Sequence, residues 1–220
     1  MSARSAGGAG GDRAVRPASA VATGRGDDGT TGLLFGDDRI YKDDPRTEAF
    51  GTIDEAVAAL GIARAELGAR RRLGELPAGL EPLEEIVLRI QRELFVVGAE
   101  LAADPGAEDR LTDGTTRVSA AMVAGVDAVL ADYEARIAFP AEFVVPGETR
   151  TSAALELART ILRRAERRAV SLERAGLVPG AHLLPYLNRL ADLLWVLARA
   201  AEQAEARPAT PARESGSSAY

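Results

Sequence analysis

Five segments of the chain carry apolar residues at alternating spacings of three and four, the spacing of an α-helix that buries one face. Proline, glycine and acidic residues separate these segments, so each is expected to form its own helix. None contains the roughly 20 consecutive apolar residues of a membrane span. The pattern predicts an all-α fold, a five-helix bundle with helices at about 45–67, 82–102, 116–137, 152–170 and 182–206.

The composition narrows the classes of function. The 220 residues are 46% hydrophobic, enough to bury one core, and we expect a single domain over residues 21–206. Residues 1–20 and 207–220 have low complexity and are expected to be disordered tails. The net charge of −6 disfavours binding to nucleic acid or membranes, and a cytoplasmic protein is expected. With no cysteine and only His182, disulfides, thiolate zinc sites and Cys–His catalysis are excluded.

The segment Ser152–Val170 carries charged residues beside its apolar stripe. At about 100° per residue, Arg159, Arg163 and Glu166 fall on one flank of this helix. The other charged residues extend this flank (Glu156 and Arg167) or point further round toward solvent (Arg164 and Arg168). Guanidinium groups beside apolar side chains are suited to binding phosphate, because their donors form a planar fork. A surface helix stabilised by ion pairs is the alternative, and composition alone favours it.

The segment Thr23–Gly36 is rich in glycine, threonine and aspartate. Its GxGxxG sequence is not a dinucleotide-binding fingerprint, because no strand precedes it and no helix pattern follows it. It also lacks the Gly-Lys-Thr of a Walker loop. Such a loop can bind phosphate through backbone N–H groups and hydroxyls, with Lys42 or the arginines of 152–170 supplying cations. An ordinary flexible loop is the alternative, and it fits this segment alone equally well.

Polar residues also lie on the flanks of the other helices. Asp54 has the same angular offset on its helix as Arg159 has on its own. An aspartate at a helix–helix contact is costly unless it is paired, so we expect these two residues to form an ion pair. Asn188 is a compact amide near the start of the last helix. Asp192 and Arg199 share its face and are interpreted as solvated charges.

The stretch Phe139–Arg150 connects the third segment to the arginine-bearing helix. Its prolines predict an extended chain that ends in a Pro-Gly turn. Phe143 within this stretch is either a core residue or part of a pocket wall. The core is favoured when the residue is considered alone.

Motifs along the chain, in this order, resemble those of the PduO-type ATP:cob(I)alamin adenosyltransferases. They are TxxGDDGTTxLxxG (23–36), KDDPRxEAFGTIDE (42–55), FVVPG (143–147), ARTxxRRAERR (158–168) and YLNRLxDLL (186–194). Together they extend over most of the chain, from about residue 23 to residue 199. Each motif alone is weakly specific, whereas the ordered set is highly specific.

The resemblance implies a five-helix bundle that assembles as a homotrimer with active sites between subunits. It implies transfer of the 5′-deoxyadenosyl group of ATP to cob(I)alamin, which forms adenosylcobalamin and releases triphosphate, with Mg²⁺ as the cofactor. A reductase and an adenosylcobalamin-dependent mutase are the protein partners that it suggests.

The resemblance also assigns roles to residues. The ATP-phosphate loop corresponds to Thr23, Gly26, Thr31, Gly32 and Lys42. The nucleotide-binding face corresponds to Arg163, Glu166, Arg167 and Asn188, with Glu166 as the metal ligand and Arg163 as a catalytic residue. Asp54 and Arg159 correspond to a salt bridge across the subunit interface. Phe143 corresponds to a catalytic aromatic residue that keeps the lower face of the corrin free of an axial ligand.

The chain departs from the family pattern at Phe50, Val57, Glu148 and Glu156, where Tyr, Asn, Gly and His are common. Most of these positions adjoin the corrinoid half of the site, whereas the ATP half is nearly intact. A corrinoid- or ATP-binding or sensing protein of the same fold, with weak or no turnover, is therefore the alternative function. A purely structural bundle is disfavoured, because helix packing requires none of the polar residues on the nucleotide-binding face.

Overall fold

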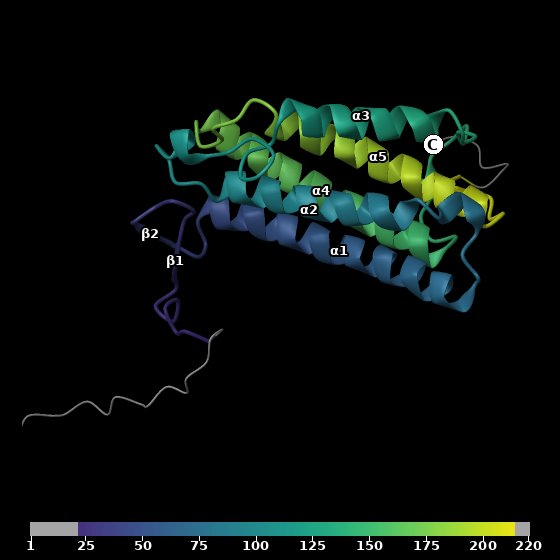
Figure 1. Cartoon of the computed structure of the whole chain (residues 1–220), viewed down its shortest axis with the longest axis horizontal. Coiled ribbons are helices and arrows are strands. Elements are labelled where there is room, and N and C mark those ends of the chain that lie inside the picture. Colours follow the sequence, from purple (N-terminus) through teal and green to yellow (C-terminus); the bar gives the residue numbers. More distant parts are fainter. Residues whose placement is uncertain (1–21, 214–220) are drawn as a thin grey trace, which may run out of the picture.

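The computed structural model describes residues 22–213, and its helices confirm the five-helix architecture expected from the sequence (Figure 1). The expected tail at 1–20 lies outside the described residues. No helix within residues 22–213 is long and apolar enough to cross a membrane. The helices are α1 (Pro45–Leu73), α2 (Leu83–Leu101), α3 (Ala120–Glu134), α4 (Arg150–Arg174) and α5 (Leu183–Ala204).

The five helices lie roughly side by side along the long axis of the molecule (Figure 1). Helix α1 packs against α2 and α4, α4 packs against α5, and α5 packs against α3. The apolar stripes predicted from the spacing face this core. Fully buried leucines come from four of the helices: Leu60, Leu94, Leu162 and Leu190. Burial of each such side chain stabilises the folded bundle by about 1.5–3 kcal/mol.

Helix α4 begins where a capping box satisfies its first backbone donors. The Thr149 hydroxyl accepts a hydrogen bond from Ser152 N at 3.0 Å, and the Ser152 hydroxyl accepts one from Thr149 N at 3.2 Å. Both residues are buried. The start of α4 is therefore fixed against the bundle, next to the loop that carries Phe143.

Three helices differ from the prediction by more than two residues at one end or both. Helix α1 runs on to Leu73 because arginines in its last turns find carboxylates on other elements, Arg70 with Glu205 and Arg71 with Glu84, and it ends at Gly74 in the left-handed conformation. Helix α4 extends beyond 152–170 at both ends. Helix α3 is shorter than 116–137, because the Ser119 hydroxyl caps it by accepting from Met122 N.

Two short antiparallel strand pairs accompany the helices, although the sequence pattern predicted none. Strands β1 (Thr30–Gly32) and β2 (Arg39–Tyr41) form a hairpin beside the start of α1 (Figure 1). Strand β3 (Val144–Val145) in the loop before α4 pairs with β4 (Thr210–Pro211). The expectation of a disordered tail over 207–220 is therefore wrong for residues 207–213.

The arginines expected to point toward solvent instead join α4 to α1. Arg164 forms an ion pair with Glu55, and Arg168 forms one with Glu48. Later residues of α4 thus pair with earlier residues of α1, so the two helices are antiparallel. This direction places the C-terminal half of α4 near the β1–β2 hairpin and its N-terminal half near β3 and β4.

Candidate functional site

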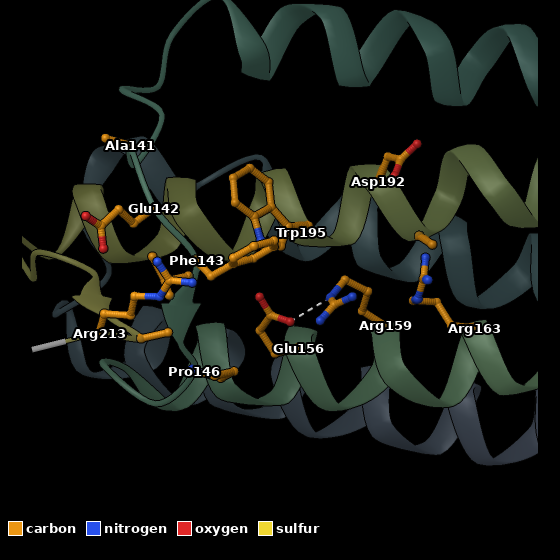
Figure 2. Close-up of a pocket in the computed structure, with 13 residues that line it drawn as sticks. Ala141, Glu142, Phe143, Pro146, Glu156, Arg159, Arg163, Asp192, Trp195 and Arg213 are labelled. Carbon is orange, nitrogen blue, oxygen red and sulfur yellow. Dashed lines mark hydrogen bonds and ion pairs between the residues drawn. The ribbon is translucent and has the colours of Figure 1, made fainter. Parts of the chain in front are cut away.

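A cavity of about 750 Å³ lies where the loop before α4, the first half of α4, the middle of α5 and the β4 segment meet (Figure 2). Its volume is in the usual range for a small-molecule site. Its lining combines aromatic, cationic and acidic side chains, among them Phe143, Glu156, Arg159, Arg163, Asp192 and Trp195. Three of the predicted site residues, Phe143, Arg159 and Arg163, are therefore brought to one cavity.

Phe143 lies at the edge of this cavity and is 90% exposed. Its side chain extends from the loop toward Trp195 (Figure 2). The interpretation of Phe143 as a core residue is therefore wrong. A phenyl group left this exposed contributes little to folding, and its place at the edge of a cavity of ligand size leaves it available to contact a ligand.

The aromatic side of the cavity is reinforced from the loop and from α5. The rings of Phe139 and Trp195 stack with centroids 6.0 Å apart and planes inclined by 18°. On Trp195, the guanidinium carbon of Arg199 lies 5.5 Å from the ring centroid. Phe139 and Arg199 thus hold the Trp195 indole in place, where it forms an apolar wall of the cavity.

Next to Trp195 lies a buried ionic cluster formed by Glu156, Arg199 and Glu202, of which Glu156 also lines the cavity. Arg199 is only 1% exposed and donates to Glu156 Oε1 at 3.3 Å and to Glu202 Oε1 at 2.9 Å. The other oxygen of Glu156 accepts from Arg159 Nε at 2.6 Å. Glu156 therefore links a buried cation on α5 to a cation on α4 that lines the cavity. The interpretation of Arg199 as a solvated charge is wrong.

The buried cluster is not fully satisfied by hydrogen bonds. Within residues 22–213, Nε and Nη1 of Arg199 and Oε2 of Glu202 have no hydrogen-bond partner. Burial raises the pKa of Glu202, against the opposing effect of the Arg199 charge. Because the folded pKa lies above the unfolded value, this carboxyl favours folding at pH below the unfolded value, and that contribution is lost as the pH rises through the folded pKa.

Further along α4, the residues assigned to the nucleotide face lie together. The Asn188 amide on α5 donates to Glu166 Oε1 at 3.2 Å. Arg167 donates from Nη1 to the Arg163 carbonyl at 2.9 Å, and both arginines are exposed. Arg163 lines the cavity, whereas Arg167 lies one turn closer to the end of α4 that faces the hairpin. The predicted cationic flank of α4 therefore leads from the cavity toward the N-terminal loop.

In the N-terminal loop, Lys42 folds back onto Gly26. Its ammonium group donates to the Gly26 carbonyl at 2.7 Å. A Cβ atom at Gly26 would lie 2.8 Å from Lys42 Nζ and 3.1 Å from the Thr30 carbonyl oxygen, so a larger residue here would displace the lysine tip from its present position. Thr31 and Gly32 lie in β1, and Thr23 precedes the turn. The loop residues predicted to bind phosphate are thus held in one compact segment.

Two residues that the sequence reasoning missed hold this loop. Arg39 donates to the Thr30 hydroxyl at 2.6 Å and to the Arg25 carbonyl at 2.7 Å. Asp28 accepts from the Thr30 hydroxyl at 2.8 Å and from its backbone N–H at 3.0 Å, and these bonds lower the pKa of Asp28. An aspartate two residues before a hydrogen-bonded threonine is the signature of an Asx turn, which was the available signal.

One chain does not bring the two halves of the predicted site into contact. Within residues 22–213, no hydrogen bond or ion pair joins the loop at 22–44 to Arg163 or Arg167. Asp54 is exposed on α1 and forms no ion pair with Arg159 of the same chain. The described residues also contain no group of three side chains that could hold a metal ion. Glu166 is thus a lone carboxylate beside Asn188.

Comparison with known proteins identifies the family. A model of the cobalamin adenosyltransferase family matches residues 21–201. The chain is 39% identical over 186 residues to a cobalamin adenosyltransferase of Cupriavidus metallidurans, covering 84% of this chain and 90% of the relative. It is 37% identical over 182 residues to a corrinoid adenosyltransferase of Citrobacter freundii, covering 83% of this chain and 94% of the relative.

Solved structures show the same fold. A variant of the PduO-type ATP:corrinoid adenosyltransferase from Lactobacillus reuteri, complexed with cobalamin and ATP, superposes with a TM-score of 0.75 at 28% sequence identity. The match covers 88% of this chain and 96% of that chain. The helical bundle is thus that of a corrinoid adenosyltransferase. The chain belongs to the cobalamin adenosyltransferase family, as its motifs indicated.

Proposed function

We propose that this protein transfers the 5′-deoxyadenosyl group of ATP to cob(I)alamin, forming adenosylcobalamin and releasing triphosphate. The observation that carries the proposal is the cavity itself, which has the exposed Phe143 and the half-buried Trp195 on one side and Arg159 and Arg163 on the other (Figure 2). A corrin ring offers a large apolar face, whereas triphosphate requires cations. The family and the relatives that match the chain support this pairing of ligands.

The reaction is a nucleophilic displacement at carbon. The electron pair of the reduced cobalt forms the Co–C5′ bond, while the C5′–O bond breaks and its electron pair leaves on triphosphate. The nucleophile needs no base, so the lack of a Cys–His pair is no obstacle. The chain must align C5′ with cobalt and stabilise the departing charge, and Arg163 at the cavity is placed for the second task.

Phe143 has a different task in this proposal. Reduction of cob(II)alamin is hard while cobalt keeps a lower axial ligand. A phenyl ring held at the cavity edge excludes water and other ligands from that face. Because the ring is 90% exposed in the chain alone, it is available to contact the corrin without leaving a gap in the core.

Mg²⁺ is the proposed cofactor, with Glu166 as its protein ligand. The residues fit, because Mg²⁺ is commonly held by one or two carboxylates together with substrate phosphates. Asn188 donates to Glu166 Oε1 and so orients the carboxylate. When bound, the ion would neutralise negative charge on the triphosphate.

A homotrimer is proposed to complete each site. The phosphate loop forms no bond with Arg163 or Arg167 of its own chain within residues 22–213, so a neighbouring subunit is needed to join them. Among the described residues Arg159 bonds through Nε alone, to Glu156, which leaves its terminal nitrogens for Asp54 of the partner subunit. Asp54 is exposed on α1, as such a contact requires.

The substrate chemistry also suggests protein partners. Cob(I)alamin arises by one-electron reduction of cob(II)alamin, so a reductase is the proposed upstream partner. An adenosylcobalamin-dependent mutase is the proposed recipient of the product. We place these steps in the cytoplasm.

A product assay separates this function from a binding or sensing role. Purified protein, MgATP and chemically reduced cobalamin are incubated without oxygen, and adenosylcobalamin and triphosphate are measured together. Transfer predicts equal amounts of the two products over many turnovers. Binding of both ligands without product formation would establish the alternative function.

Lys42→Ala is expected to weaken ATP binding by about tenfold, because a cation that is held beside the phosphate loop is lost. Cob(II)alamin affinity at saturating ATP should be unchanged. Titration calorimetry with each ligand measures both effects. Arg136→Ala, in the turn after α3, removes the same charge and serves as the control, because Arg136 forms an ion pair only with Asp132 among the described residues. An equal loss of both ligands in Lys42→Ala would refute this assignment of the loop.

A further inference from the structure

The C-terminal residues 207–213 return to the loop that carries Phe143. Strand β4 pairs with β3 in the register Val144 with Pro211 and Val145 with Thr210. One residue further on, the Ala212 N–H donates to the Phe143 carbonyl at 2.7 Å. A main-chain hydrogen bond therefore joins Ala212 to Phe143, which lines the cavity.

A side-chain bond fastens the same two segments. The Thr210 hydroxyl donates to the carboxylate of Glu148. Glu148 lies between β3 and the start of α4, and its partner lies in the C-terminal segment. The backbone pairing and this side-chain bond are thus parts of one contact between the Phe143 loop and β4.

Phe143 cannot be positioned by packing of its own side chain, because the ring is 90% exposed. The loop is held on the N-terminal side of Phe143 and at Phe143 itself, in addition to the bonds described above. At its start, Ala138 exchanges two hydrogen bonds with the Gln203 side chain, at 3.0 Å and 2.7 Å. At Phe143 itself, the backbone is held by Ala212. The direction of the ring therefore depends on the backbone, and the backbone depends on β4.

The C-terminal segment also forms part of the cavity. Ala212 and Arg213 line it together with Glu142 and Phe143, and Figure 2 shows Arg213 on the same side of the cavity as Glu142. β4 thus both bounds the cavity and holds the loop that bears its exposed aromatic ring.

We propose that β4 is a positioning element for the corrinoid step: the Ala212 amide and the Thr210–Glu148 bond hold Phe143 where its ring displaces the lower axial ligand of cobalt. The proposal rests on the proposed function. Within residues 22–213, no hydrogen bond or ion pair joins Ala212 or Thr210 to Arg163, Glu166 or Arg167 of α4. Loss of these bonds therefore affects the corrinoid step and leaves ATP binding unchanged.

The test removes the Ala212 N–H donor and leaves the other residues of β4 unchanged. Ala212→Pro removes the N–H that bonds Phe143, whereas the control Ala212→Ser keeps it. Each protein is saturated with ATP and cob(II)alamin, and the four-coordinate fraction is measured by electron paramagnetic resonance. Adenosylation rates are measured from cob(II)alamin with a chemical reductant and from pre-reduced cob(I)alamin.

Ala212→Pro is expected to keep its ATP affinity and to lose four-coordinate cob(II)alamin, with a rate from cob(II)alamin at least about fivefold lower. The rate from pre-reduced cob(I)alamin should fall less, and Ala212→Ser should match the unmodified protein. If Ala212→Pro behaves as Ala212→Ser does, the proposal is overturned. If Ala212→Pro does not fold, Thr210→Val decides. A lower four-coordinate fraction in Thr210→Val supports the proposal, and an unchanged fraction overturns it.

Failure of the proposed function gives a different result. In that case the unmodified protein itself would form neither four-coordinate cob(II)alamin nor adenosylcobalamin. If the unmodified protein and both Ala212 variants all form four-coordinate cob(II)alamin, the role of β4 is contradicted and the proposed function is not.

Discussion

Phe143→Ala is expected to abolish the four-coordinate cob(II)alamin signal and to slow adenosylation from cob(II)alamin by about 100-fold. The ring lies at the cavity edge, and its loss opens the lower face of cobalt to water or another ligand. The reaction from pre-reduced cob(I)alamin should slow much less, because that form needs no ligand removed. Electron paramagnetic resonance and parallel rate measurements from the two oxidation states check both statements.

The stability of Phe143→Ala distinguishes this role from a structural one. A core phenylalanine cut to alanine typically costs about 3–5 kcal/mol, whereas an exposed one changes stability by about 0.5 kcal/mol or less. With the ring 90% exposed, we expect an unchanged melting temperature. Phe95→Ala on α2 is the matched control, since Phe95 is also exposed but does not line the cavity. A spectrum of Phe143→Ala that equals that of Phe95→Ala would contradict the assignment.

Arg199→Met is expected to lower the free energy of unfolding at neutral pH by about 3–5 kcal/mol, because it leaves the buried carboxylates Glu156 and Glu202 without their shared cation. Urea unfolding at fixed protein concentration measures the loss. Arg189→Met is the control on the same helix. Arg189 pairs with Asp127 at 2.8 Å, but both side chains are more than a third exposed, so its loss is expected to cost about 1 kcal/mol or less.

The loss of stability in Arg199→Met is expected to depend on pH. Burial already raises the pKa of Glu202, and removal of the neighbouring cation raises it further in the folded state. Stability contributed by such a carboxyl is present below its unfolded pKa and lost as the pH rises through its folded pKa. The deficit of Arg199→Met relative to the unmodified protein should therefore shrink as the pH falls from 7.5 to about 4.5. An equal deficit at both pH values, or one no larger than that of Arg189→Met, would show that the cluster is not ionic.

The helices and their buried faces could be predicted from the sequence because each depends on local spacing. Leu60 and Leu162 stand on stripes that continue for several turns, and both are fully buried. The charged flank of α4 was predicted for the same reason, since Arg159 and Arg163 differ by one turn. Helical spacing determines which residues share a face of a helix.

Helical spacing does not determine how deep a charged residue lies. Arg199 has the same angular relation to its stripe that a solvated arginine would have, and it is buried because α4 supplies Glu156 opposite it. Arg164 was placed toward solvent by the same reasoning, but α1 supplies Glu55 as its partner. In both cases the deciding residue lies more than 40 positions away in the sequence. Single-helix reasoning contains no information about that distant partner.

The strand pairs also escaped prediction for a physical reason. β3 and β4 have two residues each, too few to show an alternating pattern, and β4 contains a proline. Their pairing joins segments separated by the whole of α4 and α5. The composition of residues 207–213 predicted disorder because composition describes the segment alone, whereas its order comes from the Phe143 loop.

The most direct test of adenosyl transfer is a single-turnover reaction with ATP that carries ¹³C at C5′. Enzyme in excess is mixed with this ATP, Mg²⁺ and pre-reduced cob(I)alamin, quenched at intervals, and its corrinoid is analysed by mass spectrometry and ¹³C NMR. We predict that the label appears on the carbon bonded to cobalt, at the same rate as unlabelled triphosphate is released. ATP that stays intact beside bound cobalamin, or that yields orthophosphate without a labelled corrinoid, would contradict the account.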